Sequence, residues 1–524
     1  MLLLAAFQLA TGVLAARIAA RASVGFAANL REDMYDNVQT FAFSNIDKFS
    51  TASIVTRLTT DTTNVQNAFQ MLMRTAIRAP VMLIFSMIVS FRISRDISMT
   101  FLIILPILAL ALFFIIRSVF PVFSRVFRTY DELNNVVQEN VRGIRVVKSF
   151  NQERHEIGKF GAISARIYQD FSKGERLITL NAPLMQFCIY TCMIVISWLG
   201  AKAIIASGND PALGLTTGNL TALITYTMQI LSSLMMLSMV FAMLTISLSS
   251  ARRIAEVLEE RSDIPQPEQP VMTVRNGAVD FDHVSFVYAS KADKKVLDDI
   301  DLHIRSGETI GIIGGTGASK SSLVQLIPRL YDVTCGKLTL GGVDVRDYDL
   351  DTLRGAVAMV LQKNELFSGT IAENLRWGNE NATDEQLRHA CKLACADEFI
   401  SAMPDGYDTH IEQGGTNVSG GQKQRLCIAR ALLKKPKVLI LDDSTSAVDT
   451  RTDAQIQQAL STYIPDTTKI IIAQRISSVQ NADRIVVLDD GHIDAVGCHD
   501  ELLRTCEIYR EVYESQQKGG EDDA

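Results

Sequence analysis

The chain has 524 residues, of which 48% are hydrophobic and 21% charged, and it carries a formal net charge of −7. A mean hydropathy of +0.15 at this length excludes a disordered chain and argues against a wholly soluble enzyme. Residues 1–261 contain 24 Lys and Arg against 17 Asp and Glu, a net of +7, whereas residues 262–524 contain 27 against 41, a net of −14. This asymmetry predicts a membrane domain followed by a soluble domain, and it excludes a basic tail that binds nucleic acid.

Five segments of the first half are long or apolar enough to enter a bilayer, whose hydrocarbon core takes about 20 apolar residues to cross. Four of them carry no charge, and the fifth is shorter but extends helically towards Thr75. In the last uncharged run, a loop-like start leaves Leu220–Ile246 as the expected helix. The five segments are Met1–Ala16, Ala79–Phe91, Ile97–Ile116, Leu177–Ala201 and Pro211–Ala251.

The loops between these segments set the expected orientation. Residues 17–78 and 117–176 are long and rich in Lys and Arg, whereas residues 92–96 and 202–210 are short. Long basic loops stay in the cytosol, so we expect a multi-pass protein of the cell membrane whose C-terminal half is cytosolic. An odd number of spans that begins outside indicates that a first transmembrane helix is missing from this chain.

The membrane domain also carries hints about its helices and its substrate. Helical periodicity in Met34–Phe41 and Val136–Ile144 predicts that transmembrane helices continue below the membrane. No charged residue lies deep within a span, and an apolar cavity suits a hydrophobic small molecule, a lipid or an amphipathic peptide. Asn181 and Gln186 either face a substrate path or only form hydrogen bonds between helices.

A proline-rich segment separates the two halves. Residues 262–275 hold three prolines within six positions, which predicts a stiff linker after a membrane domain of residues 1–261. Residues 276–515 alternate strand-like runs, such as Thr309–Ile313 and Val438–Leu441, with helical ones, which predicts an α/β domain. Residues 516–524 are polar, and we expect them to form a disordered tail.

The clearest chemical motif follows the first of these strands, where a glycine-rich turn leads into a helix. Small residues let backbone N–H groups wrap phosphates, Lys320 reaches the β- and γ-phosphates, and Ser321 offers a hydroxyl to Mg²⁺. Ser319 stands where a P-loop has glycine, and serine would be costly there if the position requires a positive φ. The candidate nucleotide-binding residues are Gly314, Gly315, Thr316, Gly317, Ala318, Ser319, Lys320, Ser321 and Ser322.

Two further motifs accompany this loop. Val438–Asp443 is an apolar strand that ends in two carboxylates, which fits a strand that holds Mg²⁺ through Asp442. A buried strand with an acidic edge is a common alternative. Val418–Arg425 opens a helix with Ser-Gly-Gly, and the free backbone N–H groups at such a start bind anions.

With these motifs in order, residues 279–503 resemble the nucleotide-binding domain of ATP-binding cassette (ABC) transporters, and the first half resembles the membrane domain of the exporter type. The resemblance implies six spans, the first absent here, and short coupling helices at Phe49–Ser53 and Phe150–Arg154. It also implies that ATP and Mg²⁺ are bound, that Tyr288 stacks on adenine and that Gln362 senses Mg²⁺. It assigns the signature motif to Ser419, Gly420, Gly421 and Gln422, and the D-loop, with Asp449, to Ser446–Asp449.

Two residues depart from the pattern of the members that hydrolyse ATP. Asp443 stands where the family has a glutamate that positions the attacking water, and Gln474 stands where it has a switch histidine. Aspartate is one methylene shorter than glutamate, and glutamine cannot carry a proton as histidine does. Both changes impair the activation of water while leaving ATP binding largely intact.

The resemblance also implies a partner, because in this family each ATP lies between the P-loop of one domain and the signature of another. The chain has one of each, so we expect a second half-transporter in the lipid bilayer. We favour a heterodimer in which this chain's own ATP site is degenerate and its signature completes the partner's active site. The alternatives are a slow homodimeric exporter and a regulatory subunit that uses ATP as a switch without transport.

Overall fold

The computed structural model describes residues 1–210, 214–288, 295–315, 317–443 and 448–521. The chain divides into two compact units. The expected domain boundary after residue 261 lies one residue from the division that follows Glu260, but the sequence does not predict that residues 40–49 belong to the second unit. The helical unit comprises Met1–Gln39 and Ser50–Glu260, and the α/β unit comprises Thr40–Phe49 and Arg261–Ala524.

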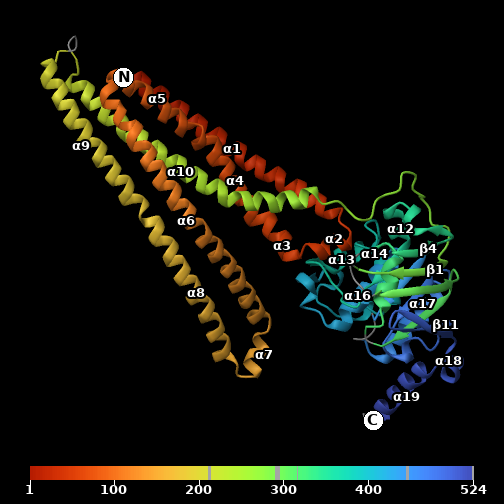
Figure 1. The fold of residues 1–524 in the computed structure, drawn as a ribbon. Coiled ribbons are helices and arrows are strands. Elements are labelled where there is room, and N and C mark those ends of the chain that lie inside the picture. Colours follow the sequence, from red (N-terminus) through yellow and green to blue (C-terminus); the bar gives the residue numbers. More distant parts are fainter. Residues whose placement is uncertain (211–213, 289–294, 316, 444–447, 522–524) are drawn as a thin grey trace. The chain divides into compact units, whose positions relative to one another are not determined.

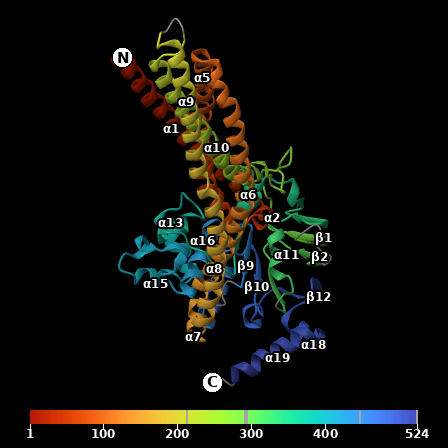
Figure 2. The ribbon, with the colours of Figure 1, turned by 60° about the vertical axis from the view of Figure 1, so that its left-hand side comes forward.

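The described part of the helical unit consists of nine α-helices and two π-helical turns, η1 (Arg57–Asp61) and η2 (Leu72–Ala76) (Figure 1). The short helix α7 joins α6 to α8, and these two long helices run side by side (Figure 2). The α-helices are α1 (Leu2–Gln39), α3 (Thr51–Thr56), α4 (Thr62–Met71), α5 (Arg78–Ile93), α6 (Arg95–Arg142), α7 (Ile144–Ser149), α8 (Glu153–Thr179), α9 (Asn181–Ser207) and α10 (Thr217–Glu259).

Within the described residues, five helical segments are long and apolar enough to cross a membrane, and each overlaps one of the five segments expected from the sequence. Helix α6 has 48 residues, which at 1.5 Å per residue makes it about 70 Å long, more than twice the thickness of a hydrocarbon core. The long helices therefore continue beyond the membrane, as their periodicity predicted.

Apolar side chains from three helices form the core of the helical unit. Leu108 on α6, Ile196 on α9 and Leu223 on α10 are fully buried in one cluster. Other large side chains of the same helices, such as Phe113 and Trp198, are more than half exposed. Helices that are apolar on the outer as well as the inner face require an apolar surrounding, which a lipid bilayer supplies.

Beyond the apolar span of α10, an ion-pair network joins this helix to η1. The guanidinium of Arg253 donates two hydrogen bonds to the carboxylate of Asp61, whose side chain is 1% exposed. Arg57, at the other end of η1, donates to the carbonyl oxygen of Arg253 (2.7 Å) and to the carboxylate of Glu256 (2.9 Å). The network fixes the end of α10 against the segment that joins α3 to α4.

The α/β unit contains a four-stranded antiparallel sheet in the order β2-β1-β4-β5 and a six-stranded sheet in the order β12-β11-β3-β10-β9-β6. In the larger sheet only β12 runs antiparallel to its neighbour. The strands are β1 (Val279–Phe286), β2 (Leu297–Ile304), β3 (Thr309–Gly314), β4 (Cys335–Leu340), β5 (Val343–Asp344), β6 (Val357–Val360), β7 (Gly369–Thr370), β8 (His410–Ile411), β9 (Val438–Asp442), β10 (Thr468–Ile472), β11 (Arg484–Asp489) and β12 (His492–Gly497), with β7 and β8 forming a separate pair.

Helices cover the larger sheet, and all residues of β9 and β10 are buried, as expected for a parallel sheet packed on both faces. The α-helices in the described part of the α/β unit are α2 (Phe43–Lys48), α11 (Lys320–Leu326), α12 (Leu350–Ala356), α13 (Ile371–Arg376), α14 (Asp384–Leu393), α15 (Asp397–Ser401), α16 (Gly420–Leu433), α17 (Thr450–Tyr463), α18 (His499–Thr505) and α19 (Glu507–Glu521). Because β3, β10 and β9 are parallel neighbours, their carboxyl ends meet at one edge of the sheet, which is where such folds bind ligands. The α/β fold predicted from the sequence is confirmed.

Three segments differ from their expected positions. The short helices α2 and α7 end just before Phe49 and Phe150, the residues at which coupling helices were expected to begin. Ser50 already caps the next helix, α3, so the turn of chain at Phe49–Ser53 has no room for a separate helix. Helix α19 runs to Glu521, and residue 516, where a disordered tail was expected to start, lies within it.

Candidate functional site

The glycine-rich loop between β3 and α11 closes around the side chain of Lys320. Its ammonium group donates hydrogen bonds to the carbonyl oxygens of Gly314 and Gly315, both at 2.8 Å. Burial lowers the pKa of this lysine, while Asp442 and Asp443 act in the opposite direction. The charge therefore lies inside the loop, where phosphate oxygens could replace the two carbonyl groups.

Ser319 adopts the left-handed backbone conformation in which serine was expected to be costly. Its φ is +65°, and it directly precedes the first residue of α11. An L-residue in this region loses about 1–2 kcal/mol relative to glycine because its Cβ approaches the following carbonyl. The backbone of the loop thus keeps a glycine-like shape although the residue is serine. Of the nine loop residues expected to bind nucleotide, Thr316 lies outside the described residues.

Two carboxylates stand at the end of β9, beside this loop. Asp442 is 4% exposed and accepts a hydrogen bond from the side chain of Ser321. Burial raises the pKa of Asp442, and the bond from Ser321 opposes this rise. A hydroxyl next to a buried carboxylate is a set of oxygen ligands that fits Mg²⁺.

Asp443, the next residue, is held by two uncharged amides. Gln362 and Gln474 each donate from Nε2 to the same carboxylate oxygen, Oδ2, at 3.2 and 2.8 Å. The backbone at Asp443 has a φ of +47°, and its N–H donates to the carbonyl of Ile472 on β10. Burial raises the pKa of Asp443, whereas the bond from Gln362, the charge of Lys320 and the bond from Gln474 lower it. The structure thus brings together the three residues that sequence analysis singled out around the hydrolytic position.

The signature residues form the start of α16. The Ser419 hydroxyl accepts from the N–H of Gln422 at 3.3 Å, and the N–H of Ser419 donates to the Gln422 side chain at 2.9 Å, which is a capping box. Ser419 and Gly420 are exposed. A helix of 14 residues therefore presents its positive end to solvent, where an anion could bind.

The signature helix and the P-loop helix belong to different cores of the α/β unit. Helix α16 packs through Leu426 and Ile428 into a cluster with the helices around α14. Helix α11 packs through Leu323 and Val324 into the cluster that contains the antiparallel sheet. The Ser-Gly-Gly end of α16 is thus built independently of the chain's own phosphate loop.

Tyr288 belongs to an aromatic cluster beside α11. Its ring is 44% exposed and makes edge-to-face contacts with Phe286 at 4.8 Å and with Tyr331 at 5.0 Å between ring centroids. Its hydroxyl forms a hydrogen bond of 2.8 Å with Ser322. These contacts fix the ring near the P-loop helix while leaving part of it accessible for stacking.

Only part of the expected D-loop can be described, because Ser446 and Ala447 lie outside the described residues. Asp449 caps α17: its carboxylate accepts from the N–H and the hydroxyl of Thr452 at 2.9 and 2.8 Å. These hydrogen bonds lower the pKa of Asp449. The carboxylate is therefore charged at neutral pH and serves at least as a helix cap.

Sequence analysis missed the segment that packs on the aromatic cluster. Asp47, on α2, accepts a hydrogen bond of 2.9 Å from the hydroxyl of Tyr331, a residue 284 positions later in the chain. The ring of Phe43 contacts the same tyrosine at 6.0 Å. Asn45 donates to the carbonyl of Arg261. No sequence motif predicts this contact between α2 and Tyr331, because neither segment belongs to a recognisable motif.

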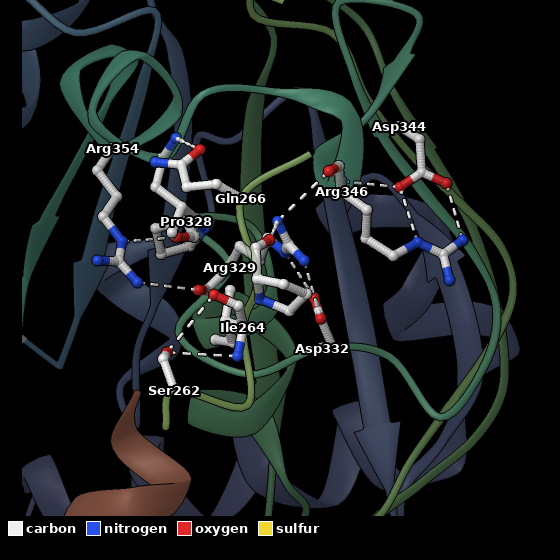
Figure 3. Close-up of polar contacts among 11 residues, drawn as sticks. Ser262, Ile264, Gln266, Pro328, Arg329, Asp332, Asp344, Arg346 and Arg354 are labelled. Atoms are coloured by element: carbon white, nitrogen blue, oxygen red, sulfur yellow. Dashed lines mark hydrogen bonds and ion pairs between the residues drawn. The ribbon is translucent and has the colours of Figure 1, made fainter. Parts of the chain in front are cut away.

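The linker is anchored by a second group that the sequence did not reveal (Figure 3). Arg329, 3% exposed, donates two hydrogen bonds to the carboxylate of Asp332 and reaches the carbonyl oxygens of Pro265 and Arg346 at 3.3 and 3.4 Å. Gln266 adds a bond to Asp349. The predicted stiff linker therefore lies bound along the α/β unit from its first prolines.

A P-loop beside a pair of carboxylates, on an α/β unit that follows apolar membrane helices, defines an ATPase joined to a membrane domain. Two family models match the chain: the ABC transporter transmembrane region over residues 1–248 and the ABC transporter domain over residues 297–446. The chain is 36% identical over 513 residues to the ABC transporter ATP-binding protein YfiB of Bacillus subtilis, covering 98% of this chain and 88% of that protein. It is 34% identical to the ABC transporter ATP-binding protein Rv1273c of Mycobacterium tuberculosis, covering 97% and 87%.

The structure is similar to that of a bacterial Atm1-family ABC exporter with ATP bound, with a TM-score of 0.84 and 25% identity over 95% of this chain and 86% of that one. The chain belongs to the ABC transporter family. It is an exporter-type chain in which a multi-pass membrane domain is fused to a cytosolic ATP-binding domain, and ATP hydrolysis drives transport. Half-transporters of this kind work as dimers in the lipid bilayer.

Proposed function

We propose that this chain is one half of a heterodimeric exporter, that its own ATP site is degenerate, and that its signature motif completes the active site of its partner. The observation that supports this proposal most strongly is the environment of Asp443. This short carboxylate accepts hydrogen bonds from two amides, Gln362 and Gln474, at one oxygen. Two donors on Oδ2 compete with an attacking water for that oxygen, and the shorter side chain places the carboxylate farther from the water than a glutamate would.

The chemistry of Gln474 adds to the same conclusion. A histidine at this position could exchange a proton and carry a positive charge next to the transferred phosphoryl group, whereas an amide does neither. Loss of positioned general-base catalysis typically costs a factor of about 10²–10⁴ in rate. The P-loop keeps its phosphate-binding groups, so ATP binds at this site but is turned over slowly.

We propose the binding roles from the contacts described above together with the resemblance to ABC nucleotide-binding domains. The P-loop backbone, Lys320 and Tyr288 hold the phosphates and adenine of ATP at this chain's site. Ser321 and Asp442, with Gln362, would hold Mg²⁺, which would supply positive charge that stabilises the phosphate oxygens. The segment Ser419–Gln422 lies against the γ-phosphate of the ATP that the partner's P-loop carries, and Asp449 faces the same dimer interface.

Transport follows from a difference in affinity between two states. ATP binds more tightly when its phosphates contact both chains, so it favours the closed pair of nucleotide domains, and hydrolysis in the partner's site reopens the pair.

We propose a hydrophobic or amphipathic substrate. The exposed methionines Met235, Met236 and Met239 on α10 support this choice, because methionine adapts to varied apolar ligands.

A comparison of two variants in the purified transporter tests whether the two ATP sites differ in their rate of hydrolysis. Ser419→Ala removes a group that acts on the partner's ATP and should lower ATPase activity by about tenfold or more. Asp443→Asn affects only the slow site and should change the rate much less. The opposite order would reject the heterodimer assignment.

Ser419→Ala also removes a helix cap, and this effect needs its own control. Thr383→Ala removes the equivalent capping box from α14, where Thr383 and Gln386 exchange the same pair of hydrogen bonds. Both substitutions should lower stability by about 1 kcal/mol. Only Ser419→Ala should lower ATPase activity.

A further inference from the structure

The C-terminal helix α19 is anchored in the core of the α/β unit by its first half. Tyr509 is 0% exposed and belongs to the main cluster of buried apolar residues. Its hydroxyl forms a hydrogen bond of 2.7 Å with Nδ1 of His499, and Val512 and Tyr513 pack against the same cluster. The position of the helix is therefore fixed without any contribution from its later, more exposed residues.

One of these later residues, Gln516, binds the loop that follows β10. Its Nε2 donates to the carbonyl oxygen of Gln474 at 2.7 Å, and its Oε1 accepts from the N–H of Ile476 at 2.9 Å. Ile476 is 1% exposed and begins the 3₁₀ turn η6 (Ile476–Ser478). One amide thus clamps two backbone groups on either side of Arg475, between the end of a buried strand and a buried turn.

The clamped residue is the one that holds Asp443. The backbone of Gln474 is bound by Gln516, and its side chain donates to Oδ2 of Asp443 at 2.8 Å. A side chain can keep such a contact only while its backbone stays in place, because a displacement of 1 Å breaks a hydrogen bond of this length. A continuous chain of hydrogen bonds therefore runs from α19 through the switch position to the acidic end of β9.

We propose that Gln516 is a positioning residue for this chain's own ATP site: from α19 it holds the backbone of Gln474, and so keeps the amide of Gln474 on Asp443. This inference rests on the proposed function, according to which ATP binds at this chain's own site beside Gln474 and Asp443. It assigns to the C-terminal helix control over how long this site retains ATP.

The next residue on the helix provides a matched control. Gln517 has the same side chain, and its Nε2 donates to the hydroxyl of Tyr513 on the same helix at 3.1 Å. Gln516→Ala removes two bonds to the switch loop, whereas Gln517→Ala removes one bond within α19. Because Gln516 is exposed, water can satisfy the freed backbone groups, and both variants should fold.

The experiment measures nucleotide retention on this chain in the purified full-length transporter in lipid nanodiscs. The probe is radiolabelled 8-azido-ATP, chased with unlabelled ATP, cross-linked by light at intervals and resolved by chain on a gel. We expect Gln516→Ala to shorten the half-life of label on this chain by about fivefold, because the loop that carries Gln474 beside the nucleotide loses the equivalent of about one net hydrogen bond. Gln517→Ala should leave the half-life unchanged.

A variant cycle with Gln474 separates positioning from a merely structural role. In a Gln474→Ala background the route to Asp443 is already cut, so adding Gln516→Ala should shorten the half-life no further. Equal half-lives for Gln516→Ala and Gln517→Ala, or additive effects in the cycle, would overturn the proposal. Rapid conversion of the retained label to ADP on this chain would instead overturn the degenerate site, whatever the effect of Gln516.

Discussion

Replacing Arg253 with methionine tests the network that holds the end of α10, the helix that leads into the linker. The substitution keeps a long apolar stem but removes both hydrogen bonds to Asp61, whose side chain is 1% exposed. Removal of one partner from a buried ion pair leaves an uncompensated charge and costs about 3–5 kcal/mol. Since the Arg253 side chain is 45% exposed, we expect the lower end, about 3 kcal/mol.

A loss of about 3 kcal/mol lowers the Tm of a unit of this size by roughly 6–12 °C. The assay heats the full-length transporter in lipid nanodiscs and measures the fraction that stays monodisperse. Arg166→Met is the matched control, because it makes the same substitution in the pair of Arg166 with Glu132, whose side chains are 55% and 49% exposed. Exposed pairs contribute about 0–1 kcal/mol, so this shift should stay below about 4 °C.

The double variant Asp61→Leu with Arg253→Met tests whether the loss of stability comes from the uncompensated charge of Asp61. Replacing both partners of a buried pair by apolar side chains is often neutral, so the Tm should return towards that of the unaltered chain. The reasoning is refuted if Arg253→Met shifts the Tm no more than Arg166→Met does. It is equally refuted if the double variant is less stable than the single one.

Three further predictions concern the α/β unit. Ser319→Gly relieves the strain of a left-handed serine, about 1–2 kcal/mol, and should raise the Tm by roughly 2–8 °C. Lys435→Gly, at φ +50° after α16, should raise it by a similar amount. A lower Tm for both variants would contradict the strain argument. Lys320→Ala should abolish labelling of this chain by azido-ATP, and unchanged labelling would show that the loop does not bind phosphate. Arg329→Leu leaves Asp332 and two carbonyl groups without their buried donor, and should expose the linker to limited proteolysis; a cleavage pattern like that of the unaltered chain would argue against the anchor.

The sequence predicts the features that depend on local pattern. Uncharged runs indicate the membrane spans because the bilayer imposes their length and composition. The residues at the ends of β3, β9 and β10 could be assigned to one site through the resemblance to ABC nucleotide-binding domains, and in the structure the carboxyl ends of these parallel strands share one edge. The cost expected at Ser319 also followed from the motif alone, since the conformation of a P-loop is set by its glycines.

The remaining parts of the site arise from contacts between distant segments. Asp47 meets Tyr331 across 284 positions, and an exposed aspartate on a short helix carries no signal of its partner. Gln516 lies in a polar stretch that the sequence analysis predicts to be a disordered tail. In the structure it belongs to α19, which is anchored by the buried Tyr509 two turns earlier. Amide side chains bind backbone groups in many ways, so their partners follow only from the fold.

The most direct test of the central claim identifies the nucleotide on each chain of the purified transporter during turnover. The complex is supplied with Mg²⁺ and radiolabelled 8-azido-ATP, stopped by cross-linking, and separated into its chains, from which the bound nucleotide is analysed as ATP or ADP. We predict that this chain carries mainly ATP while a partner chain carries ADP. Label found mainly as ADP on this chain, formed as fast as the transporter turns over, would contradict the degenerate site.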